Sequence, residues 1–111
     1  MLDAIKAAGV EANTIVLWLS DNAAAPTAGP SDTRFGSNGP FRGELGDALE
    51  GSIRTIGMIK WPGRIAPRVS NEMLSVHDWF PTLASIIGAK VPTDRPLDGV
   101  DQSPFVTGQQ E

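Results

Sequence analysis

Residues 14–22 read TIVLWLSDN, an apolar run that ends in three polar residues. A continuous run with this content of β-branched and aromatic residues is typical of a strand buried on both faces of a parallel sheet. Upstream, residues 1–9 carry apolar residues at helical spacing and end in Gly9, a common C-terminal stop for a helix. A helix followed by a buried strand indicates an α/β fold.

A long segment without apolar periodicity follows the strand. Residues 23–46 are rich in glycine, proline, serine and asparagine, which predicts a loop. Loops longer than ~15 residues in a compact domain are usually functional or disordered. In open α/β sheets, ligands bind beyond the carboxyl ends of the strands, where this loop begins. We therefore expect the loop to form a site.

The remaining residues predict fewer elements than a complete sheet domain needs. Residues 56–60 form a short second strand that a Trp-Pro-Gly turn ends, and residues 75–89 have the apolar spacing of a helix. The tail from Lys90 is irregular, with one helical turn expected after Asp101. Two strands do not make a stable parallel sheet by themselves. We expect residues 1–111 to be a single partial domain of a larger fold.

Composition excludes several classes of function. Hydrophobic residues make up 41% and charged residues 20%, as in an ordinary folded globular chain. The net charge of -4 argues against nucleic acids and anionic membrane surfaces as partners. There is no apolar run long enough to span a membrane and no secretory leader pattern. The absence of cysteine excludes disulfides and zinc–thiolate sites, and it leaves the compartment unknown.

Asp21 and Asn22 are the first candidate site residues. They follow the predicted buried strand directly, where a carboxylate and an amide oxygen can converge on a hard cation such as calcium or magnesium. A pair of this kind is by itself more often a turn or a helix cap. The pair therefore needs support from the rest of the sequence.

That support is a resemblance along most of the chain. The order of its motifs resembles that of the sulfatase family of the alkaline phosphatase superfamily. The segments that carry the resemblance are TIVLWLSDN (14–22), GPFRG (39–43), EGSIR (50–54), KWPGRI (60–65), HDWFPTL (77–83) and LDGVDQSP (97–104). Each motif is weak alone, and their common order makes the resemblance specific.

The resemblance implies a fold, a reaction and a metal. The fold is α/β, here a partial doubly wound sheet of the alkaline phosphatase-like type with a long site-forming loop after the first strand. The reaction is hydrolysis of a sulfate ester with a formylglycine hydrate and a divalent cation, most often calcium. Asp21 and Asn22 match a metal-ligand pair of the family, whose cation would hold and polarise the sulfate oxygens.

The loop departs from the family pattern at two positions. A lysine that contacts sulfate commonly lies in a Gly-x-Lys-Gly stretch, and here residues 43–46 have Leu45 in its place. Ala23 stands where glycine typically follows the metal-ligand pair. Either the positive charge comes from elsewhere or the site has lost its ordinary activity. Arg42 and Arg54 are the nearby cations, and we expect structural roles for both.

The nucleophile motif is absent from the sequence. The family needs Cys-x-Pro-x-Arg, or serine in place of the cysteine, and residues 31–34 (SDTR) lack the proline and have the wrong spacing. The Asp-Asp pair that completes the metal shell is missing too. At most two protein ligands remain for a cation that takes about six or more oxygens. We assign no catalytic residue within this chain and expect it to be inactive in isolation.

Several other polar and aromatic residues are expected to be structural. His77 lies at the entry to the predicted helix, with Asp78 as an N-cap or first-turn acid. Glu50 and Arg54 are four residues apart and can pair on one helical turn. The tryptophans have no interleaved basic residues, which favours packing over a nucleic-acid platform.

We therefore interpret the chain as the C-terminal portion of a sulfatase-like catalytic domain. The partner of the parent enzyme would be a small-molecule sulfate ester. One alternative is a phosphate-ester hydrolase of the same superfamily. Another is a non-catalytic binding module that self-associates to cover its exposed sheet edge.

Overall fold

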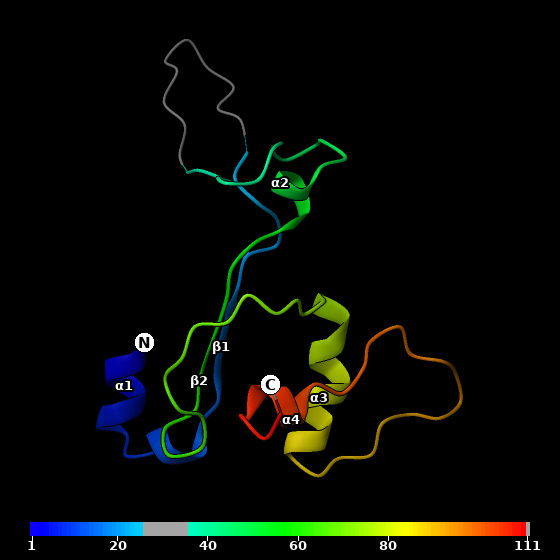
Figure 1. Ribbon diagram of the computed structural model, residues 1–111. Coiled ribbons are helices and arrows are strands. Elements are labelled where there is room, and N and C mark those ends of the chain that lie inside the picture. Colours follow the sequence, from blue (N-terminus) through cyan, green and yellow to red (C-terminus); the bar gives the residue numbers. More distant parts are fainter. Residues whose placement is uncertain (26–35, 111) are drawn as a thin grey trace. The chain divides into compact units, whose positions relative to one another are not determined.

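A computed structural model describes residues 1–25 and 36–110 (Figure 1). The chain forms two compact units, one of residues 15–60 and the other of residues 1–14 together with the chain from Trp61 onward. The mixture of helices and strands agrees with part of an α/β fold. The single partial domain and the doubly wound sheet both remain predictions.

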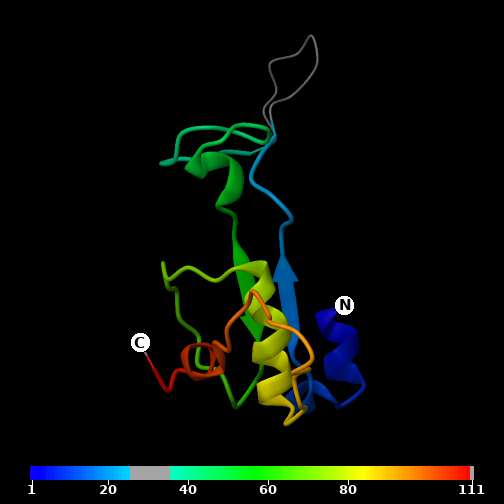
Figure 2. The same ribbon diagram turned by 90° about the vertical axis from the view of Figure 1, so that its right-hand side faces the viewer.

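The unit of residues 15–60 is built on a two-stranded ribbon. Strand β1 (Val16–Leu19) pairs antiparallel with β2 (Gly57–Lys60), so that Trp18 lies opposite Met58. Both views show the two strands side by side (Figures 1 and 2).

The prediction that the first strand is buried on both faces is wrong for this structure. Trp18 is 48% exposed, and Leu19 is 38% exposed. The pairing in the described residues is antiparallel rather than parallel. Burial on both faces requires flanking strands and covering helices, and a two-stranded ribbon has neither.

The described residues between the two strands lie beyond one end of the ribbon (Figure 1). Of these, residues 20–25 and 36–49 contain no helix or strand, as the loop prediction required. A short helix, α2 (Glu50–Ile53), follows them and buries Gly51 and Ser52. The Gly51 amide donates to the Arg42 carbonyl at 2.7 Å, and a Cβ on Gly51 would lie 2.4 Å from the Gly43 carbonyl oxygen. The loop therefore packs on α2 at a distance that only glycine permits.

The second unit begins with the predicted N-terminal helix. Helix α1 (Leu2–Ala7) is followed by Gly9 with a φ of 70° and then by the 3₁₀ turn η1 (Glu11–Asn13). The indole N–H of Trp61 donates to the Ala12 carbonyl at 3.2 Å, which joins this N-terminal segment to the turn that starts at Trp61.

The predicted helix over residues 75–89 is shorter than expected. A 3₁₀ turn, η2 (Val76–Asp78), comes first, and α3 (Trp79–Ile86) continues from it. Ser75 is the N-cap of η2, and Asp78 completes a capping box with it. Because Asp78 caps the 3₁₀ turn, its side chain makes no capping bond to α3 itself.

The core of this unit lies between α3 and the tail. Helix α4 (Ser103–Val106) is the helical turn predicted after Asp101, and it contacts α3. Thr82 is fully buried and its hydroxyl accepts from the Gln102 amide at 2.8 Å, while Pro81, Ala84 and Val106 are buried beside it in the same unit.

The carboxylate of Asp78 joins the start of this helix pair to the tail. It is buried and accepts from the Ser75 amide at 2.8 Å and from the Val100 amide at 2.9 Å. Gly99 lies so close that a Cβ there would be 2.0 Å from the His77 carbonyl oxygen. Within the described residues, no helix is long and apolar enough to cross a membrane.

Candidate functional site

The candidate site begins where β1 ends. The Ser20 amide meets the Ile56 carbonyl at 3.5 Å, and the Ser20 hydroxyl donates to the Asn22 carbonyl at 2.9 Å. The second of these bonds closes a turn over Asp21, and the first ties the start of the turn to the residue before β2. The Asp21 side chain is exposed and has no hydrogen bond or ion pair to any described residue, and Asn22 is half-buried.

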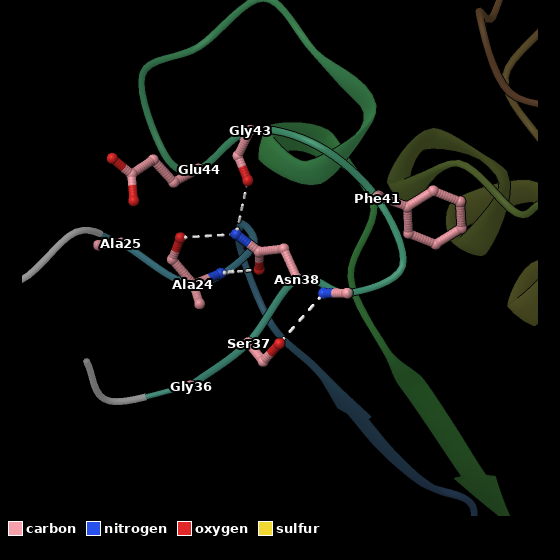
Figure 3. A pocket seen from close by; sticks show the side chains of 9 residues that line it. Ala24, Ala25, Gly36, Ser37, Asn38, Phe41, Gly43 and Glu44 are labelled. Atoms are coloured by element: carbon pink, nitrogen blue, oxygen red, sulfur yellow. Dashed lines mark hydrogen bonds between the residues drawn. The ribbon is translucent and has the colours of Figure 1, made fainter.

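The backbone directly after Asn22 is held from two sides. Ala23 is buried, and its amide donates to the Ser52 carbonyl at 3.3 Å. Ala24 bonds to the Asn38 side chain through both its amide and its carbonyl, at 2.7 and 3.0 Å (Figure 3). The Leu45 amide also donates to the Ala24 carbonyl, at 3.2 Å. The oxygen pair Asp21–Asn22 therefore lies between two anchored points, the strand end and Ala24.

Alanine at position 23 fits this turn. Among the described residues, no non-glycine residue has a positive φ, so the backbone at Ala23 does not need the conformational freedom of glycine. The departure from the family pattern at this position leaves the turn unstrained.

The side chains at the strand end have the type of ligand atom that a hard cation prefers, but they are too few to fill its coordination shell. A carboxylate and an amide are the oxygen ligands that calcium and magnesium prefer, and they stand on adjacent residues. Across residues 1–25 and 36–110, no group of three or more His, Cys, Asp or Glu residues could hold a metal ion. The described residues thus supply only part of a coordination shell of about six or more oxygens.

A cavity of about 280 Å³ lies beside the anchored backbone (Figure 3). Asn38, Phe41 and Glu44 line it, together with Ala24, Ala25, Gly36, Ser37, Gly39 and Gly43. Asp21 and Asn22 are not among the lining residues. All of the lining residues belong to the loop that the sequence predicted to form a site, but the sequence assigned none of them an individual role in a cavity.

The two arginines of this unit differ in what they contact. Arg54 forms the predicted pair with Glu50, at 2.9 Å, and its guanidinium lies 4.5 Å from the centre of the Phe41 ring. These contacts give Arg54 the structural role that we expected. Arg42 is exposed, and its side chain contacts no described residue through a hydrogen bond or ion pair. Its expected structural role remains a prediction.

Leu45 is 45% exposed. Its backbone amide donates to the Ala24 carbonyl, which fixes the position of Leu45 relative to Ala24. The Leu45 side chain carries no charge. Residues 31–34, which we interpreted as loop, lie outside the described residues.

His77 belongs to the other unit. Its ring Nδ1 lies 2.9 Å from the Ser75 hydroxyl, and the side chain is exposed. A local contact across two residues at a helix start agrees with a structural role. Nearby, hydrogen bonds from the backbone and hydroxyl of Ser103 and from the Ser85 hydroxyl hold the pKa of Asp101 below its usual value.

Comparison with known proteins decides the family. A family model described as Sulfatase matches residues 1–89. The chain belongs to the sulfatase family.

Comparison with three curated sulfatases shows what share of their length this sulfatase chain covers. It is 43% identical over 103 residues to steryl-sulfatase from Rattus norvegicus, covering 90% of the chain and 18% of that relative. It is 41% identical over 102 residues to N-acetylgalactosamine-6-sulfatase from Canis lupus familiaris, covering 91% and 19%. It is 37% identical over 111 residues to arylsulfatase A from Bos taurus, covering 97% and 20%. The chain spans about a fifth of the length of these relatives.

The sulfatase match includes the whole candidate site. Residues 1–89 contain the Asp21–Asn22 pair, the 36–46 loop, α2 and α3. The relatives are all named as sulfatases, which does not favour the phosphate-ester or the binding-module alternative.

Proposed function

We propose that this sulfatase chain supplies two metal ligands and one site loop to an enzyme that hydrolyses sulfate esters. The observation that carries the proposal is the Asp21–Asn22 pair at the end of β1. The backbone is anchored on both sides of the pair, and the Asp21 carboxylate is exposed without a partner among the described residues. An anchored backbone with an uncommitted carboxylate is what a ligand position requires.

The exposed apolar residues support the larger fold that the proposal needs. Trp18 and Met58 in the ribbon are 48% and 57% exposed, and Ile56, directly before β2, is 64% exposed. Residues of this size are mostly buried in complete folded proteins. We propose that the ribbon is part of a doubly wound sheet whose further strands and helices cover these side chains.

The cation, most often calcium in this family, would stabilise negative charge that develops on the sulfate oxygens. Asp21 would bring a charged oxygen to it, and Asn22 a neutral one. The turn closed by Ser20 would hold both residues where the loop begins. The chain has no cysteine, so a formylglycine derived from cysteine has to come from outside residues 1–111.

Arg42 is our candidate for the positive charge that Leu45 does not bring. It lies on the same loop and is exposed, whereas Arg54 is engaged by Glu50 and Phe41. This candidate differs from the structural role that we expected from the sequence. Arg42→Lys should retain most of the hydrolysis of an aryl sulfate by the native protein, and Arg42→Ala should lower it. If Arg42→Ala is as active as the unsubstituted enzyme, the charge comes from another part of the enzyme.

The reaction is tested on the native protein isolated from its source. We expect it to hydrolyse an aryl sulfate faster than the matching aryl phosphate. Asp21→Ala should lower the rate by ~100-fold or more, because a lost ligand removes several kcal/mol of charge stabilisation. Preference for the phosphate ester, or full activity of Asp21→Ala, would contradict the proposal.

A further inference from the structure

Asn38 makes an unusual set of contacts for a loop residue. Its Oδ1 accepts from the Ala24 amide at 2.7 Å, and its Nδ2 donates to the Ala24 carbonyl at 3.0 Å and to the Gly43 carbonyl at 3.0 Å (Figure 3). The side-chain amide thus bonds to both backbone groups of one residue, as a neighbouring strand would. It is half-buried, so water competes less for these bonds than on an open surface.

These contacts fix the end of the segment that carries the oxygen pair. Asp21 and Asn22 lie between Ser20, which is tied to Ile56 and closes its own turn, and Ala24. Ala24 is fixed by Asn38 and by the Leu45 amide. Asn38 therefore connects the strand end to the loop at a point two residues beyond Asn22.

We propose that Asn38 is a positioning residue for the Asp21–Asn22 pair, acting through Ala24 without touching the cation itself. This inference rests on the proposed function, since it needs the pair to be a cation site. Without Asn38, the Ala24 amide and the Gly43 carbonyl would bond to water, and the backbone that carries Asp21 and Asn22 would lose two of the bonds that hold it at Ala24. Residues that orient metal ligands typically account for a tenfold to hundredfold difference in affinity.

Two substitutions separate the shape of Asn38 from its hydrogen bonds. Asn38→Ala removes all of these bonds. Asn38→Asp keeps the size and the acceptor for the Ala24 amide, and it replaces the donor with an oxygen that faces the Ala24 and Gly43 carbonyls. Ser37→Ala is the matched control, because the Ser37 hydroxyl accepts from the Gly39 amide at 3.2 Å and makes no bond to Ala24.

The experiment treats the full-length native protein with a chelator, removes the chelator, and then titrates the protein with terbium(III) while following emission excited through tryptophan. Trp18 lies three residues before Asp21 and serves as the antenna. Trp18→Phe and Asp21→Asn identify the emission that comes from the pair. We expect Asn38→Ala and Asn38→Asp to raise the Kd of this site by about tenfold and Ser37→Ala to change it less than twofold. Amide hydrogen exchange at Ala24 should accelerate in Asn38→Ala, while unchanged exchange in β2, which belongs to the same unit, shows that this unit is still folded.

The outcomes distinguish this inference from the function on which it rests. If Asp21→Asn weakens terbium binding and both Asn38 variants bind like the unsubstituted protein, the positioning role is overturned and the cation pair stands. If Asp21→Asn leaves the Kd unchanged, the cation pair fails and the positioning role fails with it. Weakening by both Asn38 variants, with faster exchange at Ala24, supports the role. If Asn38→Ala is too unstable to titrate, the Kd of Asn38→Asp decides the question.

Discussion

Asp21 and Gly51 contribute to the site in different ways. Asp21 is left without a partner by the described residues, so its charge is available to a ligand. Gly51 contributes by having no side chain, which lets the loop carbonyls approach α2. One residue contributes chemistry and the other contributes space.

Gly51→Ala should destabilise the protein by ~1–3 kcal/mol, because the new methyl group would overlap the Arg42 and Gly43 carbonyls and force the loop away from α2. Urea unfolding followed by circular dichroism measures the change. Gly57→Ala is the control in the same unit, since its Cβ would meet only the end of the Leu19 side chain, at 3.0 Å. A destabilisation by Gly57→Ala as large as that by Gly51→Ala would contradict this account.

The charge of Asp101 makes a local contribution to stability that depends on pH. Its folded-state pKa is lowered by hydrogen bonds from Ser103 and Ser85, so the ionised form favours the folded state. The contribution is complete above the unfolded-state pKa, about 3.9, and is lost as the pH falls from there through the lowered folded-state pKa. Asp101→Asn should therefore flatten the dependence of thermal stability on pH below about 4.5. Identical acid profiles for the two proteins would show that these bonds do not stabilise the charge.

At the scale of the elements, Asp78 joins the start of α3 to the tail. Asp78 carries both the capping of η2 and the bond to Val100, and it is buried. Asp78→Ala should lower stability by about 1–3 kcal/mol, because a capping bond is lost and the Val100 amide loses the part-buried bond to its acceptor. Asp98→Ala, at an exposed position of the same tail, should have little effect. Thermal unfolding of both variants provides the measurement, and equal melting temperatures would contradict the role of Asp78.

The sequence predicted the local elements better than their environment. The terminal helix, the second strand, the Glu50–Arg54 turn and the helical turn after Asp101 each follow from short-range spacing and capping residues. Burial of the first strand was predicted wrongly, because burial depends on strands and helices that the described residues do not contain. At the site, spacing could single out Asp21 and Asn22. It could not reveal Asn38, whose contacts reach Ala24 across 14 residues.

At the scale of the whole molecule, the exposed apolar ribbon has consequences for the isolated protein. Trp18 and Met58 lie directly opposite each other and are about half exposed. We expect the 111-residue protein to bind a hydrophobic dye and to self-associate with rising concentration, because the ribbon edges and these side chains are uncovered. Trp18→Lys with Met58→Lys should reduce both effects. Sizing chromatography that shows a strict monomer without dye binding would contradict this prediction.

The isolated protein should also lack sulfatase turnover. It provides two candidate ligands, Asp21 and Asn22, and no formylglycine precursor motif. Hydrolysis of an aryl sulfate by the purified 111-residue protein, above that of its Asp21→Ala variant, would contradict the assignment of the nucleophile to another part of the enzyme.

The central claim is that the chain works as part of a larger formylglycine sulfatase. The most direct test is the intact mass of the native protein from its source, measured on a sample that is also treated with an aldehyde-reactive hydrazide. We predict a species several times heavier than 11.7 kDa that takes up the hydrazide. A species of 11.7 kDa without uptake would contradict the claim and leave a sulfatase-family chain without sulfatase chemistry.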